Sequence, residues 1–412
     1  MQSYEIFILI FCLAALFAYI NARFIKLQQT IGIVVLSILF SLIVLLAGSF
    51  FPSLSNKFIH IVSSIDFHDL LMNGLLSFLL FAGSIHINSI NLKSERLPII
   101  AFSTVGILIS TFLVGTLLYF LIFSFHLQVG YIYCLLFASL ISPTDPIAVL
   151  SILKRAGIPK SLETKIAGES LFNDGVAVVI FLTILEIAQT GLERTSVSDV
   201  LIMFVRETGG GLLFGLFLGY LGYYLLRSID QFEVEVMITV AVVMGGYLLA
   251  TRLHISGPLS MVVAGIIIGN KARTMSVSEK TKEYLDKFWE LVDEMLNAIL
   301  FMLIGLEMLV IKTSWQIAII GFIAIVIILF ARWVSIVIPF LAIRKRVSFV
   351  KNAVAIMTWG GLRGGLSIAL ALSLPIEMHR NLFVSMTYMV VVFSIIIQGL
   401  TIGKLYKKLS QK

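Results

Sequence analysis

Charged residues are scarce in this chain of 412 residues, at 13% of the sequence, whereas 59% of the residues are hydrophobic. Soluble domains contain about 25% charged residues. A soluble protein this apolar would have too little polar surface to cover its excess of apolar side chains. The composition therefore excludes a soluble fold and predicts an all-α polytopic protein whose solvent is the lipid bilayer.

Cysteine is also scarce, with 2 residues. Cys12 and Cys134 both lie in apolar stretches, so we expect no disulfide framework but two small buried thiols. The N-terminus shows neither a basic n-region nor a cleavage-site pattern. Tyr4–Asn21 is long for a signal sequence and is expected to be a retained first span. We expect no soluble domain in addition to the spans.

Long apolar stretches occupy nearly the whole chain. Because a membrane-spanning helix needs about 20 apolar residues, the sequence predicts one transmembrane unit of about 13 spans. They run near Tyr4–Asn21, Thr30–Phe50, Asp69–Ile87, Pro98–Phe125, Val129–Ile152, Leu162–Gln189, Val200–Leu226, Val234–Leu253, Ser256–Asn270, Tyr284–Val310, Trp315–Ile343, Phe349–Leu374 and Asn381–Leu405.

The net charge of +7 has a simple distribution. If the loops alternate sides, Lys57, Arg194, Lys312 and Arg380 fall on one side and 22 of the 30 basic residues fall on the opposite side. The remaining four, Arg206, Arg252, Arg332 and Arg363, fall within spans. The positive-inside rule then places the N-terminus outside and the C-terminus in the cytoplasm, as in a bacterial inner membrane. Basic residues spread over many short loops indicate topology, not nucleic-acid binding.

Two aspartates, Asp145 and Asp174, lie in the middle of the fifth and sixth predicted spans. A carboxylate at membrane depth costs roughly 2.5–3.5 kcal/mol on insertion scales, so such residues are usually functional. Chance rarely places two polar clusters in adjacent apolar segments. The pattern predicts a site for a cation or a proton inside the membrane.

In the fifth span, Pro143 and Pro146 bracket Thr144 and Asp145. Proline removes a backbone donor and clashes with the preceding turn, so the helix should break here. A break at membrane depth is tolerated only where it lines a cavity or is buried in protein. Freed carbonyl groups and the Thr144 hydroxyl are then available as oxygen ligands. The alternative is a simple proline kink with a satisfied aspartate.

The sixth span carries Glu169, Ser170, Asn173 and Asp174. Ser170 and Asp174 are four residues apart and share a helix face, and Glu169 and Asn173 form the adjacent strip. Asp174 and Ser170 can present oxygen atoms to a cation. Asn173 is expected to hold Glu169 or a backbone carbonyl without adding charge. The alternative is a structural polar network between helices.

The twelfth span contains Gly360, Gly361, Gly364 and Gly365 around Arg363. These glycines disfavour a regular helix, so this is a second interrupted span. Paired broken helices in corresponding positions of two repeats mark the midplane site of a secondary transporter, and the fifth and twelfth spans would form this pair. Arg363 is expected to balance the opposed helix ends or a carboxylate. The alternative is glycine used only for close packing.

Arg332 lies in the middle of the eleventh span. An unpaired arginine there would be costly, so a buried acidic partner is predicted. Glu169 is the candidate, because Asp174 must stay free to exchange ligands. The alternative is an arginine that snorkels to a membrane face.

Other residues allow weaker expectations. Trp289, Trp315 and Trp359 lie near span ends or breaks, where interfacial anchors are found. Glu294 and Glu307 lie toward helix ends and are expected to be interfacial, or gate-lining at best. The glycines of the seventh span suggest close helix packing, either within the chain or in a dimer.

Four motifs together resemble the monovalent cation/proton antiporters, in particular the NhaP-like bacterial sodium/proton exchangers. They are the run Ser142–Pro146, the run Gly168–Gly175, the mid-span pair Ala331-Arg332 and the run Gly360–Gly364. The similarity extends over nearly the whole chain, with the motifs in order and at suitable spacing.

The resemblance implies about 13 helices with inverted repeats and a homodimer in which a core domain moves against a dimerisation domain. Core helices would come in part from residues 69–190 and 284–405, and the other helices would form the scaffold. The implied ion site consists of Thr144, Asp145, Ser170 and Asp174. The implied supporting residues are Asn173, where electrogenic relatives have a second aspartate, the structural pair Glu169 and Arg332, and Arg363 at the broken twelfth span.

One departure from the family pattern concerns the third span. Many relatives carry a carboxylate there, whereas Leu79–Gly83 contains Ala82 and no acid. The contribution of such a residue to ion coordination or access is therefore in doubt for this chain.

The expected mechanism is an exchange at Asp174, which is either protonated or bound to Na⁺ together with Asp145, Thr144 and Ser170. Because Asn173 adds no second titrating charge, we expect one proton per Na⁺ and no response to membrane potential. We expect no enzymatic activity and no cofactor, and no partner beyond the transported ions, lipid and a second copy of the chain. Li⁺ and K⁺ accept the same oxygen ligands, so the sequence leaves the choice of ion open.

Two other functional classes share part of this pattern. A cation channel can use the same acidic path but needs no opposing proton gradient. An intramembrane aspartyl protease also needs two embedded aspartates, but Thr144 and Asn173 have no obvious role in one.

Overall fold

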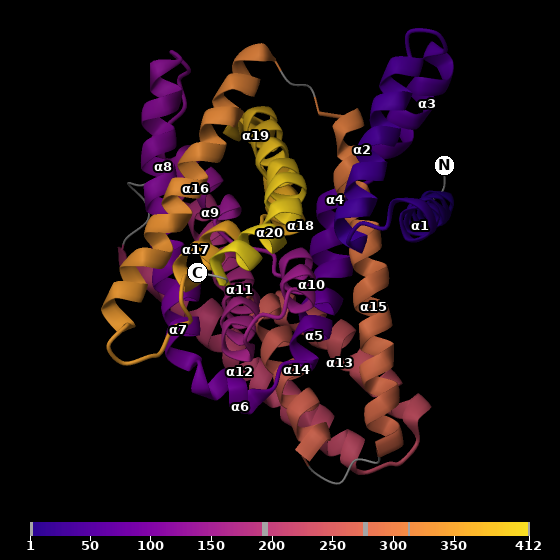
Figure 1. Cartoon of the computed structure of the whole chain (residues 1–412), viewed down its shortest axis with the longest axis vertical. Helices are drawn as coiled ribbons and strands as arrows, with labels where there is room; N and C mark the ends of the chain where they lie inside the picture. Colours follow the sequence, from indigo (N-terminus) through magenta and orange to yellow (C-terminus); the bar gives the residue numbers. More distant parts are fainter. Residues whose placement is uncertain (1–2, 192–196, 275–278, 312–313, 411–412) are drawn as a thin grey trace.

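The computed structural model describes residues 3–191, 197–274, 279–311 and 314–410. These residues form helices joined by short connections, with no strand among them (Figure 1). The all-α prediction is confirmed, and its cause is that each helix satisfies its own backbone polar groups in lipid. Arg194 and Lys312, used above to assign the sides of the membrane, lie outside the described residues.

The first ten α-helices lie within residues 3–155, and α4, α6 and α7 are short. They are α1 (Ser3–Ile20), α2 (Gln29–Ala47), α3 (Pro52–Ser63), α4 (Phe67–Asp69), α5 (Leu76–Ile85), α6 (Ser89–Ser94), α7 (Arg96–Ile100), α8 (Ile107–Ser124), α9 (Tyr131–Ile141) and α10 (Ile147–Arg155). A π-helical turn at Leu70–Leu75 connects α4 to α5, and another at Ala101–Gly106 connects α7 to α8, so that each pair forms one continuous helical segment.

The ten α-helices that follow, within residues 160–410, include the longest ones. They are α11 (Lys160–Thr190), α12 (Val197–Arg227), α13 (Phe232–Arg252), α14 (Gly257–Thr274), α15 (Glu279–Leu306), α16 (Trp315–Ile343), α17 (Ala353–Trp359), α18 (Gly365–Leu372), α19 (Arg380–Phe393) and α20 (Gly399–Ser410). A π-helical turn, Ser394–Gln398, joins α19 to α20.

Nine helical segments among the described residues are long and apolar enough to cross a membrane, and each overlaps a predicted span. The remaining predicted spans fall on α9–α10, α14, α15 and α17–α18. Two of these are interrupted and α15 is rich in charge, so a criterion based on helix length and apolar composition alone does not recognise them as membrane spans. The total of about 13 spans remains a prediction.

Two expectations about single side chains are wrong. Trp289 is fully buried rather than interfacial, and its Nε1 donates a hydrogen bond of 3.1 Å to Thr239 Oγ1. Its ring packs against Phe81, with centroids 4.7 Å apart, because α15 runs through the middle of a helix layer. Cys134 is buried as expected, but Cys12 is exposed on the outer face of α1. In the membrane this face of α1 contacts lipid instead of water, so an exposed apolar side chain there has no energetic cost.

The predicted close packing of the seventh span is confirmed, and its partner belongs to the same chain. α12 lies against α14, and a Cβ atom added to Gly215 would lie 2.7 Å from the carbonyl oxygen of Ser260. Ser260 Oγ also donates a hydrogen bond of 3.0 Å to the carbonyl oxygen of Gly211. These glycines are therefore explained by packing within the chain.

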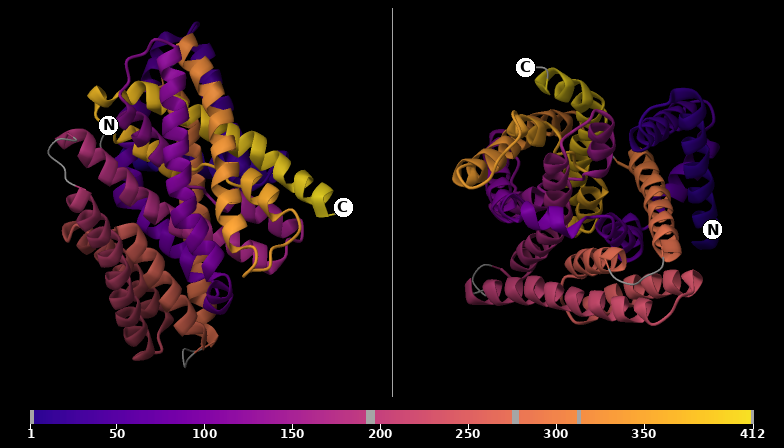
Figure 2. Two further views of the ribbon diagram at one scale, coloured as in Figure 1. Left: turned by 90° about the vertical axis from the view of Figure 1, so that its left-hand side faces the viewer. Right: turned by 60° about the horizontal axis from the view of Figure 1, so that its bottom comes forward.

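The helices pack in two groups. One group contains α1, α2, α5 and α12–α15, in which α14 packs on α5 and α12, and α15 packs on α1, α2, α5 and α13. The other contains α7–α10 and α16–α20, in which α16 packs on α8 and α19. α11 contacts both groups. In the right-hand view of Figure 2, α12 and α13 form a pink layer along one edge, and the yellow C-terminal helices lie away from it.

Candidate ion-binding site

The two predicted interruptions are present and meet each other. α9 ends at Ile141 and α10 begins at Ile147, while α17 ends at Trp359 and α18 begins at Gly365. The backbone N–H of Asp145 donates a hydrogen bond of 2.8 Å to the carbonyl oxygen of Leu362. A Cβ atom on Gly364 would lie 2.7 Å from Cβ of Asp145, so only glycine allows this approach. The breaks are thus a crossing of four half-helices, not isolated kinks.

Asp145 is held at this crossing by the helix that follows it. Its Oδ1 accepts a hydrogen bond of 2.9 Å from the backbone N–H of Ile147, in the first turn of α10. Carboxylates at helix N-termini are stabilised by free N–H groups and by the helix dipole. The side chain is partly exposed and lines a cavity. The proline break therefore aims a carboxylate into that cavity.

A small hydrogen-bond network joins the broken span to α11. Thr144 Oγ1 lies 3.1 Å from Ser170 Oγ, and Asn173 Nδ2 donates a hydrogen bond of 2.9 Å to Thr144 Oγ1. Asn173 Oδ1 accepts a longer bond, of 3.4 Å, from the backbone N–H of Thr144. The expectation that Asn173 holds Glu169 or a carbonyl group is wrong. The proline-flanked break frees the N–H of Thr144, and the amide of Asn173 satisfies it.

Asp174 lies on α11 beside this network and lines the same cavity as Asp145. No hydrogen bond or ion pair links its side chain to another described residue. The cavity has a volume of about 680 Å³ and receives residues from α2, α5, α10, α11, α15 and α18. Two carboxylates and Thr144 thus line one water-accessible space, whereas Ser170 does not line it and is linked to it through the hydroxyl of Thr144.

Glu169 and Arg332 form a buried ion pair. Arg332 Nη1 lies 2.5 Å from Glu169 Oε1, and both side chains are almost fully buried. Arg332 Nη2 also donates a hydrogen bond of 3.3 Å to the carbonyl oxygen of Met357, in α17. The pair therefore ties α11 and α16 to the first half of the second broken span. Arg332 does not snorkel to a membrane face.

Arg363 is buried between the two breaks. Its Nη1 donates a hydrogen bond of 3.2 Å to the carbonyl oxygen of Pro143, and its backbone N–H donates one of 3.1 Å to Ser394 Oγ. The last carbonyl groups of a helix have no partner within it and carry partial negative charge. The guanidinium group lies where α9 ends, so it offsets this charge, as expected.

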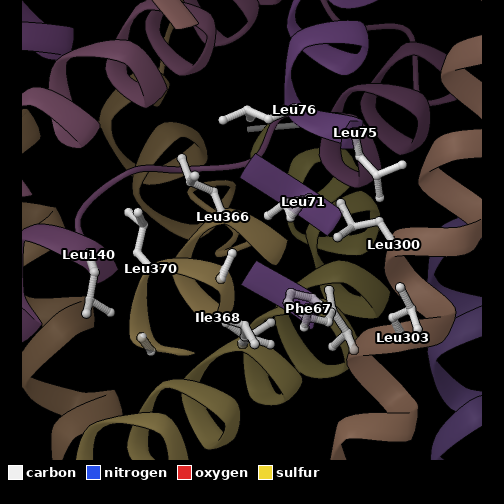
Figure 3. Close-up of a cluster of buried hydrophobic side chains, with 14 of the residues drawn as sticks. Phe67, Leu71, Leu75, Leu76, Leu140, Leu300, Leu303, Leu366, Ile368 and Leu370 are labelled. Carbon is white, nitrogen blue, oxygen red and sulfur yellow. The ribbon is translucent and has the colours of Figure 1, made fainter. Parts of the chain in front are cut away.

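A cluster of buried apolar side chains adjoins the cavity (Figure 3). Leu71, Leu300 and Leu366 line the cavity, and Phe67, Leu303 and Ile368 are buried in the same hydrophobic cluster. The cluster joins α4 and α15 to α18.

Sequence reasoning missed part of the cavity wall. Asp293 and Asn297 line the cavity, and so does Glu294, which we expected to be interfacial or gate-lining at best. The available signal was the helical spacing of Asp286, Glu290, Asp293 and Asn297, which places them on one face of α15. Ala82 also lines the cavity, so the third span contributes no acid there.

Comparison with known proteins agrees with this geometry. A sequence profile described as "Sodium/hydrogen exchanger, transmembrane" matches residues 11–408. The chain belongs to the sodium/hydrogen exchanger family. The Na⁺/H⁺ antiporter NhaP of Pseudomonas aeruginosa is 49% identical to this exchanger over 96% of this chain and 95% of its own length. The Na⁺/H⁺ antiporter NhaH of Halobacillus dabanensis is 33% identical over 98% of both chains.

The same fold occurs in a solved structure of the family. The sodium proton antiporter MjNhaP1 of Methanocaldococcus jannaschii, determined at pH 8, superposes with a TM-score of 0.75 at 20% sequence identity. The superposition covers 98% of this exchanger and 97% of that chain. Membership in a family of exchangers favours coupled secondary transport over a cation channel for this protein.

Proposed function

We propose that this exchanger moves Na⁺ against H⁺ across the bacterial cytoplasmic membrane by alternating access, with one proton per Na⁺. The observation that carries the proposal is the position of Asp174, which faces a cavity and has no bonded partner in the described part of the chain, near Asp145 at the crossing of two broken helices. Such a carboxylate is costly in the charged state unless a proton or a cation accompanies it. This requirement makes the two ions compete.

In this scheme Asp174 carries the exchanged ion, and Asp145, Thr144 and Ser170 supply further oxygen ligands. Na⁺ enters through the water-filled cavity and displaces the proton of Asp174. When either Na⁺ or H⁺ is bound, the charge at the crossing is low enough for the crossing to move. The buried ion pair of Glu169 and Arg332 keeps α11, α16 and α17 together during the movement. Li⁺ and K⁺ accept similar ligands and are candidate substrates too.

The one-to-one ratio follows from Asn173. Its amide binds Thr144 through two hydrogen bonds and has no titrating proton. Each turnover then moves one positive charge in each direction, and the net charge transfer is zero.

The proposed orientation follows from the mouth of the cavity. Gln28, His86 and Lys154 line it, at ends of α2, α5 and α10 that the alternating topology places on the basic side. We therefore place the cavity on the cytoplasmic side, with the N-terminus outside. The group of α1, α2, α5 and α12–α15 is the proposed scaffold, through which two copies of the chain dimerise, and the group of α7–α11 and α16–α20 is the proposed moving core.

Proteoliposomes test this function and its stoichiometry together. A Na⁺ gradient should drive H⁺ movement at the same rate with and without a valinomycin-imposed K⁺ diffusion potential. If net charge moved, each elementary charge would feel about 2.3 kcal/mol per 100 mV. A clear acceleration by the potential would contradict the ratio, and Na⁺ flux without counter-movement of H⁺ would indicate a channel.

A further inference from the structure

α15 presents a polar stripe to the cavity. Asp286, Glu290, Asp293 and Asn297 recur every three or four residues, so they share one helix face, and all four line the cavity. α15 packs mainly on α1, α2, α5 and α13, whereas Asp145 belongs to the crossing and Asp174 to α11. The stripe and the two site carboxylates therefore line one cavity from different helices.

Two members of the stripe form a unit with an unfilled acceptor. Asn297 Nδ2 donates hydrogen bonds of 3.0 Å to Asp293 Oδ1 and 2.8 Å to the Asp293 carbonyl oxygen. Asn297 is only 3% exposed, and its Oδ1 has no hydrogen-bond partner within the described part of the chain. A buried acceptor without a partner carries the full cost of desolvation. A cation that binds both Oδ1 of Asn297 and the carboxylate of Asp293 would remove this cost.

Two further charged groups that line the cavity have partners, whereas Glu290 and Glu294 also line it and add negative charge. Asp286 Oδ1 lies 3.5 Å from His86 Nδ1, and Lys154 Nζ lies 3.2 Å from Glu163 Oε1. The cavity opens among basic loops, which repel cations, and carboxylates on its wall offset this repulsion. Asn297 is the most buried member of the stripe, and Leu300 of the apolar cluster lies about one turn further along α15.

We propose that Asp293 and Asn297 form a second, weaker site for a monovalent alkali cation, in which a partly hydrated ion waits before it passes to Asp174 across the cavity. One carboxylate and one amide oxygen suit an ion that keeps several of its waters. The inference rests on the proposed function and adds a loading step on the scaffold wall. A filled waiting site raises the effective concentration of Na⁺ at the crossing.

Transport assays from the cavity side test the loading step. Asp293→Asn and Asn297→Ala should each raise the apparent KM for Na⁺ about fivefold and leave the maximal rate unchanged. A fivefold change is what the loss of one interaction as strong as a hydrogen bond would produce. Glu283→Gln is the matched control, because Glu283 lies on the same helix, pairs with Lys287 at 2.6 Å and does not line the cavity. An unchanged KM in Asn297→Ala overturns the site, since charge attraction by Asp293 then suffices.

Binding of ²²Na⁺ to the detergent-solubilised protein tests the site without transport. Asp174→Asn should retain weak binding that Asp174→Asn/Asp293→Asn lacks, and equal binding by the two variants overturns the inference. The proposed function fails separately, if Asp174→Asn still exchanges Na⁺ for H⁺. If Asp174→Asn abolishes exchange but Asp293→Asn and Asn297→Ala have wild-type KM values, only the waiting site is refuted.

Discussion

Two carboxylates five residues apart on α11 have opposite surroundings. Glu169 is almost fully buried and bound to Arg332 at 2.5 Å, whereas Asp174 lines the cavity with no bonded partner among the described residues. The helix rotates the two side chains onto different faces, one toward α16 and the other toward the crossing. Identical chemistry thus serves two purposes: a paired acid fixes the position of α11, and an unpaired acid remains available to ions.

The largest expected effect comes from removing the unpaired acid. Asp174→Asn should reduce exchange in everted vesicles to the level of empty membranes, because an amide neither binds a proton nor balances a cation. The protein should remain folded, since no partner is lost. Fluorescence dequenching on addition of Na⁺, with a thermal unfolding curve of the purified variant, measures both. Wild-type exchange would remove Asp174 from its assigned role.

Removing one member of the paired acid should affect stability instead. Arg332→Ala leaves Glu169 buried and uncompensated, which costs about 3–5 kcal/mol for a buried pair. We expect a strongly lowered unfolding midpoint and poor yield. The double variant Glu169→Gln/Arg332→Met should recover much of this loss, because no buried charge remains unpaired. A single variant that is stable but inactive would show that the pair acts in transport.

Two glycines of the second break extend the comparison. A Cβ on Gly364 would collide with Asp145, and one on Gly361 would lie 3.2 Å from Cζ of Arg332. Overpacking costs about 1–3 kcal/mol. Gly364→Ala should lower the exchange rate, roughly tenfold, with a modest loss of stability. Gly361→Ala should mainly lower the unfolding midpoint. Equal effects of both variants on both measurements would mean that the ion site and the structural pair are not separable.

The smallest effect is expected at the hydroxyl ligand. Thr144→Val removes one candidate oxygen ligand, worth about 1 kcal/mol, so the KM for Na⁺ should rise about fivefold. Thr183→Val is the control on α11, because Thr183 Oγ1 bonds only the carbonyl oxygen of Val179, at 2.7 Å, in its own helix. A larger effect in the control would indicate a general disturbance of α11.

The sequence by itself determined the helical class, the two interruptions and the expected partner of Arg332. Each follows from a strong local cost: backbone groups in lipid, proline and glycine within an apolar helix, and an unpaired charge at membrane depth. The resemblance to cation/proton antiporters, not local cost, implied that Thr144, Asp145, Ser170 and Asp174 form one site.

Only the tertiary structure decided which polar groups face water. In the structure, Asn173 forms hydrogen bonds with Thr144 instead of Glu169, and Trp289 is buried inside a helix layer. Asp293 and Asn297 line the same cavity as Asp174. Helical spacing defines a face of α15 but not what lies across from it. That depends on how two helix groups pack around an open space, which no local propensity in the chain encodes.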